Sequence, residues 1–200
     1  MTITAEPTMR VVILDSFTTD HGGDPWDGVR AAGTVSIHPR TRPSEVVARC
    51  ADTDAVLTNK VVLDAAAIAA LPKLRYVGVM ATGANIVDLD ACRSRGIVVS
   101  NVPGYSTDSV AQLVFALLLH LTHDVAGHST DAKGGRWAAS PDFCFFRQPL
   151  RELAGETIAI VGSGAIGSAV ARIAGGFGMR SIAALVPGST SSGRRPLLEA

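Results

Sequence analysis

A glycine-rich segment at residues 162–167 has the spacing that most clearly suggests chemistry in this sequence. Five strand-like residues, Thr157 to Val161, lead directly into it, and an alanine-rich stretch follows. In a Gly-x-Gly-x-x-Gly pattern the first glycine makes a tight turn, the second lets backbone N–H groups approach a pyrophosphate, and the third lets a helix pack closely on its strand. The helix N-terminus adds unpaired N–H donors and a partial positive charge. We therefore predict that Gly162, Gly164 and Gly167 form a pyrophosphate-binding loop; a glycine-rich turn that binds nothing is the alternative.

Strand-like and helix-like segments alternate ahead of this loop. The predicted strands are residues 10–14, 34–37, 54–58, 74–80 and 97–100, and the predicted helices begin near residues 24, 43, 64 and 88. Short apolar runs that alternate with helices are typical of βαβ units and a buried parallel sheet. We therefore expect residues 9–101 to close one α/β domain.

A long helix is predicted to connect this domain to the region of the glycine loop. Its apolar residues recur at the helical period, and Ser106, Thr107 and Asp108 offer an N-cap and an acidic first turn. The expected apolar stripe consists of Val110, Leu113, Val114, Leu117, Leu118 and Leu121.

The pattern breaks down at residues 127–148, which mix polar, glycine and aromatic residues, among them Trp137. An irregular stretch of this length is unusual inside a compact domain. Aromatic residues are favoured at interfaces, so the segment is interpreted as an arm that packs on another subunit. A loop folded over its own chain is the alternative that composition leaves open.

The α/β pattern restarts at Glu156, with a helix expected at about residues 167–177 and a strand at 180–185. Residues 187–196 show no periodicity and little to bury, which predicts disorder. The sequence thus ends just after the second strand of a fold that needs about six.

Composition excludes several classes of function. With 47% hydrophobic residues, 18% charged residues and a net charge of zero, the chain is typical of soluble globular proteins and offers no electrostatic case for binding nucleic acid or a membrane surface. No apolar run reaches the roughly 18 residues of a membrane span, and the N-terminus lacks the features of a signal peptide, so we expect a cytoplasmic protein. Cys50, Cys92 and Cys144 form no CxxC pair and are interpreted as packing residues, with no metal site.

Four stretches of sequence give the chain a resemblance to a known family. They read VLTNK at 56–60, VGVMATGANIVD at 77–88, NVPGYSTDSVAQ at 101–112 and SPDFCF at 140–145, and the glycine loop follows in its expected place. Over roughly residues 10–182 the chain resembles the D-isomer-specific 2-hydroxyacid dehydrogenases. The resemblance is strongest to their glycerate dehydrogenase or hydroxypyruvate reductase branch.

This resemblance implies an α/β architecture of two domains. Residues 1–104 would be the N-terminal part of a flavodoxin-like, parallel-sheet substrate domain, and residues 105–186 the start of an incomplete Rossmann domain, with 187–200 as a disordered tail. The implied reaction is hydride transfer between NAD or NADP and a small 2-hydroxy or 2-keto acid, such as glycerate, hydroxypyruvate or glyoxylate. A homodimer formed through about residues 127–148 is also implied.

The resemblance places the substrate carboxylate on backbone N–H groups of Ala81, Thr82 and Gly83, at the end of a strand, where a capped turn is the alternative. Lys60 follows another strand end and can reach an anionic substrate, although a solvated surface lysine is the simpler interpretation. Implied cofactor contacts are Thr82, Ser106, Thr107, Val110, Gly162, Gly164, Ala165, Ile166 and Gly167.

The sequence also departs from the family pattern. The family's catalytic arginine, glutamate and histidine lie beyond the end of this sequence, so no residue here is assigned their roles. The strand at 180–185 lacks the acid that holds the ribose hydroxyls. None of the histidines lies where the acid–base histidine belongs, and neither a metal role nor a catalytic one is predicted for His21, His38, His120, His123 or His128.

We therefore expect a truncated or frameshifted member of the family, similar to it up to about Ile182 and with little or no activity alone. The coding DNA beyond codon 182 tests this expectation. Two other functions stay open: a non-catalytic fragment that associates with a full-length relative, and a nucleotide-binding module.

Overall fold

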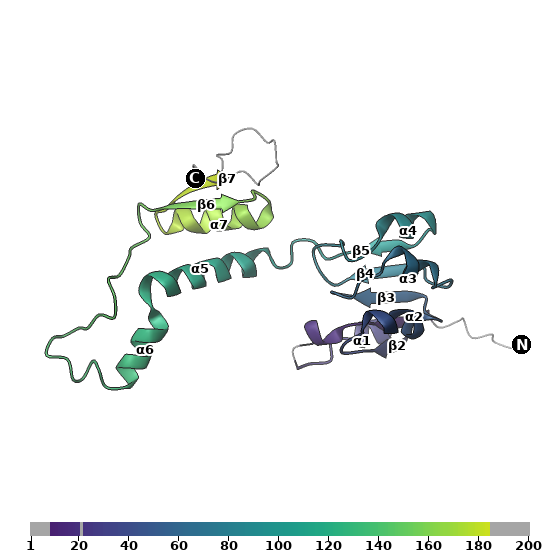
Figure 1. Cartoon of the computed structure of the whole chain (residues 1–200), viewed down its shortest axis with the longest axis horizontal. Helices are drawn as coiled ribbons and strands as arrows, with labels where there is room; N and C mark the ends of the chain where they lie inside the picture. Colours follow the sequence, from purple (N-terminus) through teal and green to yellow (C-terminus); the bar gives the residue numbers. More distant parts are fainter. Residues whose placement is uncertain (1–8, 21, 185–200) are drawn as a thin grey trace, which may run out of the picture. The chain divides into compact units, whose positions relative to one another are not determined.

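The computed structural model describes residues 9–20 and 22–184, and it divides into two compact units. The first unit ends at Tyr105 and the second begins at Ser106. Each unit is an α/β arrangement in its own right (Figure 1). The tail expected at residues 187–200, and His21, lie outside the described residues.

The first unit is built on a five-stranded parallel sheet. Its strands are β1 (Met9–Ile13), β2 (Gly33–Ile37), β3 (Ala55–Thr58), β4 (Tyr76–Val79) and β5 (Val98–Ser100). They lie in the order β2-β1-β3-β4-β5, which is the flavodoxin-like order of a doubly wound sheet. The predicted fold class is confirmed, and all five predicted strands are present with their ends within two residues of the expected positions.

The helices of this unit are shorter than the sequence pattern suggests. They are α1 (Asp27–Arg30), α2 (Val46–Cys50), α3 (Ala65–Ala69) and α4 (Leu89–Ser94), with single turns η1 (Ser16–Thr18) and η2 (Pro43–Glu45). Asp64 and Asp88 set the starts of α3 and α4, because each side chain accepts a hydrogen bond from a backbone N–H three residues on.

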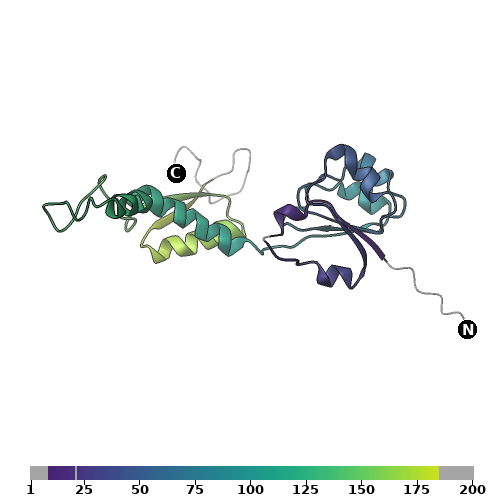
Figure 2. The ribbon, with the colours of Figure 1, turned by 90° about the horizontal axis from the view of Figure 1, so that it is seen from below.

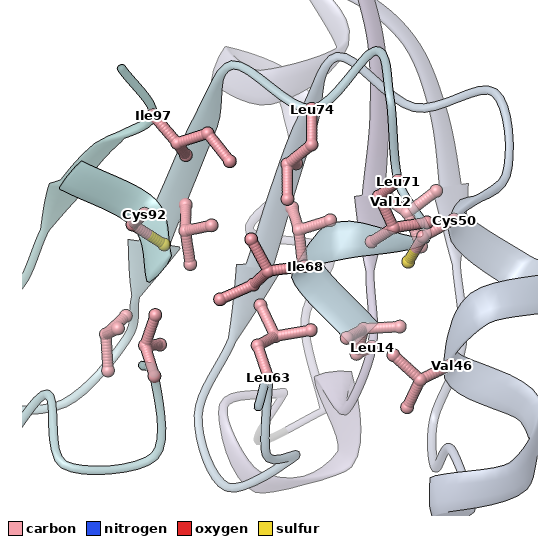
Figure 3. Packing of buried hydrophobic residues seen from close by; sticks show 14 of the residues in the cluster. Val12, Leu14, Val46, Cys50, Leu63, Ile68, Leu71, Leu74, Cys92 and Ile97 are labelled. Carbon is pink, nitrogen blue, oxygen red and sulfur yellow. The ribbon is translucent and has the colours of Figure 1, made fainter. Parts of the chain in front are cut away.

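The core of the first unit lies between the sheet and α2, α3 and α4 (Figure 3). Val46 and Cys50 of α2, Ile68 of α3 and Cys92 of α4 are fully or almost fully buried there. Burial raises the pKa of the Cys50 thiol to about 11, which keeps it protonated and unreactive. Cys50 and Cys92 are therefore packing residues, as expected, whereas Cys144 is only half-buried.

Among the described residues, the opposite face of the sheet carries only the single turn of α1 (Figure 2). A hollow of about 1060 Å³ lies there, lined mostly by apolar side chains of the strands and of α1. Parallel sheets are normally covered on both faces, so this face is less completely covered than the other.

The second unit contains α5 (Thr107–His123), α6 (Val125–Lys133), β6 (Thr157–Val161), α7 (Ala165–Gly176) and β7 (Arg180–Ala184). Strands β6 and β7 pair in parallel across α7, which makes one βαβ unit. Helix α5 packs on α7 around a small core of Ala111, Phe115, Ala169, Val170 and Ala174.

The predicted apolar stripe of α5 is only partly correct. Val114 and Leu118 pack against the α7 core together with Ala111 and Phe115, which the prediction omitted. Leu113, Leu117 and Leu121 are instead more than half exposed, at 56%, 56% and 72%. The reason is that α7 covers only one side of α5, so an apolar pattern wider than that contact stays partly in solvent.

The prediction of an irregular segment at residues 127–148 is wrong for its first part, which belongs to α6. Asp124 adopts a left-handed conformation, with φ 42°, and its side chain accepts a hydrogen bond from the N–H of Gly127. Arg147 then donates to Asp124 at 2.7 Å and pairs with Asp131 at 2.9 Å. These ion pairs tie the end of the arm back onto α6.

Within residues 9–20 and 22–184, no single helix has the length and apolar character to span a bilayer. Helices α5 and α6, bent by 57° at their junction, pass as a pair by length and composition.

Candidate functional site

The glycine loop joins β6 to α7 in the geometry that its sequence predicts. Gly162 directly follows β6 and has φ 93°, a conformation that glycine adopts without strain. A Cβ atom on Gly167 would lie 2.0 Å from the carbonyl oxygen of Gly162, so only glycine lets the helix pack this closely on the loop. Gly164 is the N-cap of α7, and a Cβ atom there would have no neighbour within 4 Å.

An anion therefore fits at this loop. The twelve residues of α7 present the N–H groups of its first turn, those of Ala165, Ile166 and Gly167, toward the open space beside Gly164. Ala165 and Ile166 are exposed, so neither side chain is buried in the core. The arrangement can hold a phosphate or pyrophosphate by backbone donors and by the helix dipole.

The start of α5 lies at the same end of the second unit as this loop (Figure 1). Asp108 of α5 contacts Arg172, and Phe115, further along α5, stacks on Phe177. Both contacts advance along the two segments together, so α5 and the α7 segment run in the same direction. Ser106 is the N-cap of α5, but contrary to the prediction its side chain makes no capping hydrogen bond. Ser106 and Thr107 are half-buried, and Val110 is 37% exposed.

In the first unit, the loop after β4 contains Ala81, Thr82 and Gly83. Ala81 is buried and its carbonyl accepts from the N–H of Val102, while Thr82 donates its hydroxyl to the Val102 carbonyl at 3.3 Å. Asn101 donates to the Thr82 carbonyl at 2.7 Å. Gly83 forms no hydrogen bond with any described residue, so its N–H can serve an external acceptor.

Lys60 follows β3, the strand next to β4. Thr58 pairs with Val79 in register, so Lys60 and the loop at Ala81–Gly83 leave the same carboxyl edge of the sheet. Lys60 is exposed, and its ammonium group forms no ion pair with a described residue. The carboxyl edge of a parallel sheet is where ligands of doubly wound folds bind, and this edge offers an ammonium and a backbone N–H to a carboxylate.

The structure thus gathers the predicted residues into two groups, one in each unit. Ala81, Thr82, Gly83 and Lys60 share the carboxyl edge of the first sheet, and the glycine loop shares one end of the second unit with Ser106, Thr107 and Val110. Among the described residues no cluster of three or more potential metal ligands occurs. Strand β7 carries no acidic residue for ribose hydroxyls.

Two residues that matter at the first edge were missing from the sequence prediction of the site. Asp15 is 5% exposed, and its carboxylate accepts the backbone N–H groups of Asn59, Lys60 and Val61. Asn101 holds the Thr82 carbonyl, as described above. An acid placed directly after an apolar strand is a signal that could have drawn attention to Asp15, because that position lies at the carboxyl edge of the sheet.

Comparisons with known proteins show the family of this chain. The model of the D-isomer specific 2-hydroxyacid dehydrogenase catalytic domain matches residues 12–195. A hydroxypyruvate reductase of Blautia hydrogenotrophica is 39% identical over 178 residues, covering 88% of this chain and 55% of the relative. A glycerate dehydrogenase of Methylorubrum extorquens is 33% identical over 141 residues, covering 70% of this chain and 45% of the relative.

A solved structure shows the same fold. The D-lactate dehydrogenase of Aquifex aeolicus, complexed with NAD and lactic acid, superposes with a TM-score of 0.68 at 23% identity, covering 91% of this chain and 52% of that one. This chain spans about half the length of the curated relatives it matches. Because the family model matches nearly the whole chain, the chain belongs to the D-isomer specific 2-hydroxyacid dehydrogenase family.

Proposed function

We propose that the chain is the N-terminal part of an oxidoreductase that transfers hydride between NAD or NADP and a small 2-hydroxy or 2-keto acid. Glycerate with hydroxypyruvate, or glyoxylate, are the proposed substrates, because similar relatives are named for these acids. The observation that carries the proposal is the glycine loop, whose open space at Gly164 and close packing at Gly167 fit a dinucleotide pyrophosphate.

In this proposal the second unit binds the cofactor and the first unit binds the substrate. The second unit is the start of the cofactor domain: the first turn of α7 holds the pyrophosphate, and Ser106, Thr107 and Val110 border the nicotinamide end. The first unit is the substrate domain, in which N–H groups of the loop at Ala81–Gly83 and the ammonium of Lys60 bind the substrate carboxylate. When bound, the nicotinamide supplies the hydride acceptor or donor.

The decisive experiment has two readings on the purified chain. Titration with NADH and with NADPH, followed by fluorescence, measures cofactor binding. Oxidation of NADH in the presence of hydroxypyruvate, glyoxylate or pyruvate measures turnover. We expect cofactor binding and little or no turnover, since no residue here is assigned the arginine, glutamate and histidine roles. Binding without turnover also fits a nucleotide-binding module, and addition of the separately expressed C-terminal half of a relative, inactive alone, separates the two, because only a dehydrogenase fragment gains turnover by complementation. Absence of cofactor binding would contradict the proposal.

We also propose that the chain forms a homodimer through residues 127–148. Phe143, Phe146 and Trp137 of this segment are 91%, 63% and 56% exposed. Beside them lies an apolar hollow of about 460 Å³ walled by Trp137, Phe145 and residues of α6. Clustered exposed aromatic side chains are favoured at interfaces over the rest of a surface.

Sedimentation of the parent and of Phe143→Ser tests the dimer. The variant should sediment as a monomer at concentrations at which the parent is dimeric. Phe17→Ser is a matched control, because Phe17 is 58% exposed but lies in the first unit. A parent that stays monomeric at high concentration would contradict the dimer.

Association with a full-length relative is the second candidate function. The thinly covered face of the first sheet, with its hollow of about 1060 Å³ beneath α1, favours it, because a parallel sheet is stable when both faces are covered. Co-expression with a relative and recovery of a mixed complex is the test; recovery of the chain alone would exclude it.

A further inference from the structure

Asp15 is a buried acid that the proposed site does not yet use. It lies two residues after the end of β1, is 5% exposed, and is 44 to 46 residues away in sequence from the groups that it binds. Its Oδ1 accepts the N–H of Asn59 at 2.8 Å, and its Oδ2 accepts those of Lys60 at 2.5 Å and Val61 at 3.3 Å. A carboxylate that accepts hydrogen bonds from three backbone N–H groups is a strong, charge-assisted anchor for residues 59–61.

The same segment is fixed at two further points. The hydroxyl of Thr58, fully buried, donates to the Val61 carbonyl at 3.0 Å. The side-chain amide of Asn59 donates at 2.8 Å to the hydroxyl of Thr18, which follows Asp15 in η1. The backbone on both sides of Lys60 is therefore held, while the Lys60 side chain stays exposed and makes no ion pair with a described residue.

This anchoring has a consequence for the neighbouring loop. The N–H of Met80 donates to the Thr58 carbonyl at 2.8 Å, so the chain after β3 and the chain after β4 start side by side. An ammonium on a fixed backbone and an unpaired Gly83 N–H at the same carboxyl edge of the sheet are two donors that one carboxylate can use. A lysine on a mobile loop would lose conformational entropy on binding the same group.

We propose that Asp15 is a positioning residue: by clamping the N–H groups of residues 59–61, it holds Lys60 where its ammonium binds the carboxylate of the 2-keto acid substrate. This proposal rests on the proposed function and deepens it, because it explains how one substrate contact of the first unit is preorganised. Asp15 itself, being buried and engaged by three donors, does not contact substrate.

The test is a double-mutant cycle of Asp15→Asn and Lys60→Met. Calorimetry with hydroxypyruvate in the presence of saturating NAD⁺ measures affinity without turnover, since both ligands are oxidised. Each single variant should weaken hydroxypyruvate binding by about tenfold, and the double variant should be no weaker than the singles, because both changes remove the same contact. Additive losses, or unchanged affinity in Lys60→Met, would overturn the proposal.

Asp54→Asn is the matched control. Asp54 also accepts a backbone N–H, that of Arg10 at 2.9 Å, but it lies at the amino edge of the same sheet. This variant should lose stability as Asp15→Asn does, yet keep the parent's affinity for hydroxypyruvate. If both variants lose affinity to the same extent, the role of Asp15 is merely structural.

Amide hydrogen exchange separates failure of the clamp from failure of the proposed function. The Lys60 amide should exchange slowly in the parent and at least tenfold faster in Asp15→Asn. Fast exchange in the parent overturns the clamp whatever the variant does, and this reading stays decisive if Asp15→Asn fails to fold. Slow exchange together with no hydroxypyruvate binding by the parent would instead contradict the proposed function, and with it the substrate role of the clamp.

Discussion

Two glycines of the proposed cofactor loop, three residues apart, should respond differently to substitution by alanine. A methyl group on Gly167 would lie 2.0 Å from the Gly162 carbonyl oxygen, whereas one on Gly164 would meet no protein atom within 4 Å. Gly164 also has φ −74°, which alanine adopts readily. Gly164→Ala therefore probes the ligand space, and Gly167→Ala probes the packing of helix on loop.

The expected magnitudes follow from these distances. A carbon and a carbonyl oxygen approach no closer than roughly 3.3 Å, so Gly167→Ala must move the helix and loop apart by about 1 Å. Overpacking of this kind costs about 1–3 kcal/mol, offset by about 1 kcal/mol of helix propensity, which leaves a net loss of up to about 2 kcal/mol in the free energy of unfolding. Gly164→Ala should change that free energy by less than about 0.5 kcal/mol, because a weaker N-cap and a less flexible unfolded chain offset each other.

The affinity for NADH should distinguish these two variants from a third, Gly175→Ala. A methyl group at Gly164 would occupy the space that the pyrophosphate approaches, so NADH should bind about 5- to 150-fold more weakly, the equivalent of about 1–3 kcal/mol. Gly175→Ala lies in the same helix with no atom within 4 Å, and it should gain about 0.5–1 kcal/mol of stability with unchanged binding.

Urea unfolding and NADH fluorescence titration of the three variants measure both quantities. Gly164→Ala should lose binding alone, Gly167→Ala should lose stability and binding, and Gly175→Ala should lose neither. If Gly164→Ala binds NADH as the parent does, the loop does not hold the pyrophosphate.

Three further substitutions, together with changes of pH, test the packing and electrostatics of the structure. Phe115→Ala removes a 4% exposed ring from the core of the second unit and should cost about 3–5 kcal/mol in urea unfolding; a cost below about 1 kcal/mol would refute that core. Arg147→Met should speed proteolysis within residues 134–150, because the ion pairs to Asp124 and Asp131 are lost. The parent should show the same sensitivity in acid. Hydrogen bonds from Arg147 lower the pKa of Asp124, and hydrogen bonds from Arg136 and then Arg147 lower the pKa of Asp131. The stabilisation from these ion pairs is therefore complete above pH 3.8 and is lost as the pH falls through the lowered pKa values. Burial, and then the Arg49 charge, lowers the pKa of His38 below 6.5, so thermal stability should fall as pH drops below 6.5, and a His38→Gln variant with the same slope would contradict this.

The sheet of the first unit could be predicted because its signals are local. Each strand is a short apolar run, and alternation with helices requires parallel pairing. The strand, turn and helix around the glycine loop could be predicted in the same way, because Gly162, Gly164 and Gly167 lie within six residues. In both cases the residues that determine the structure are neighbours in the sequence.

Features that depend on distant residues could not be predicted. Helix α6 is capped by Asp124, whose carboxylate is held by Arg147, 23 residues further on. The exposed half of the α5 stripe depends on how much of α5 is covered by α7, which periodicity does not reveal. The partners of Asp15 are 44 to 46 residues away, so an acid that seemed only to end a strand proved to anchor a second loop.

The central claim, that the loop at Gly162–Gly167 binds the pyrophosphate of a nicotinamide dinucleotide, is tested most directly by titrating the ¹⁵N-labelled chain with NADH and following its amide resonances. The account predicts the largest shifts at Gly162, Gly164 and Gly167, with smaller shifts at Ser106 and Thr107. Binding that leaves these resonances in place, or no binding at millimolar NADH, would contradict it.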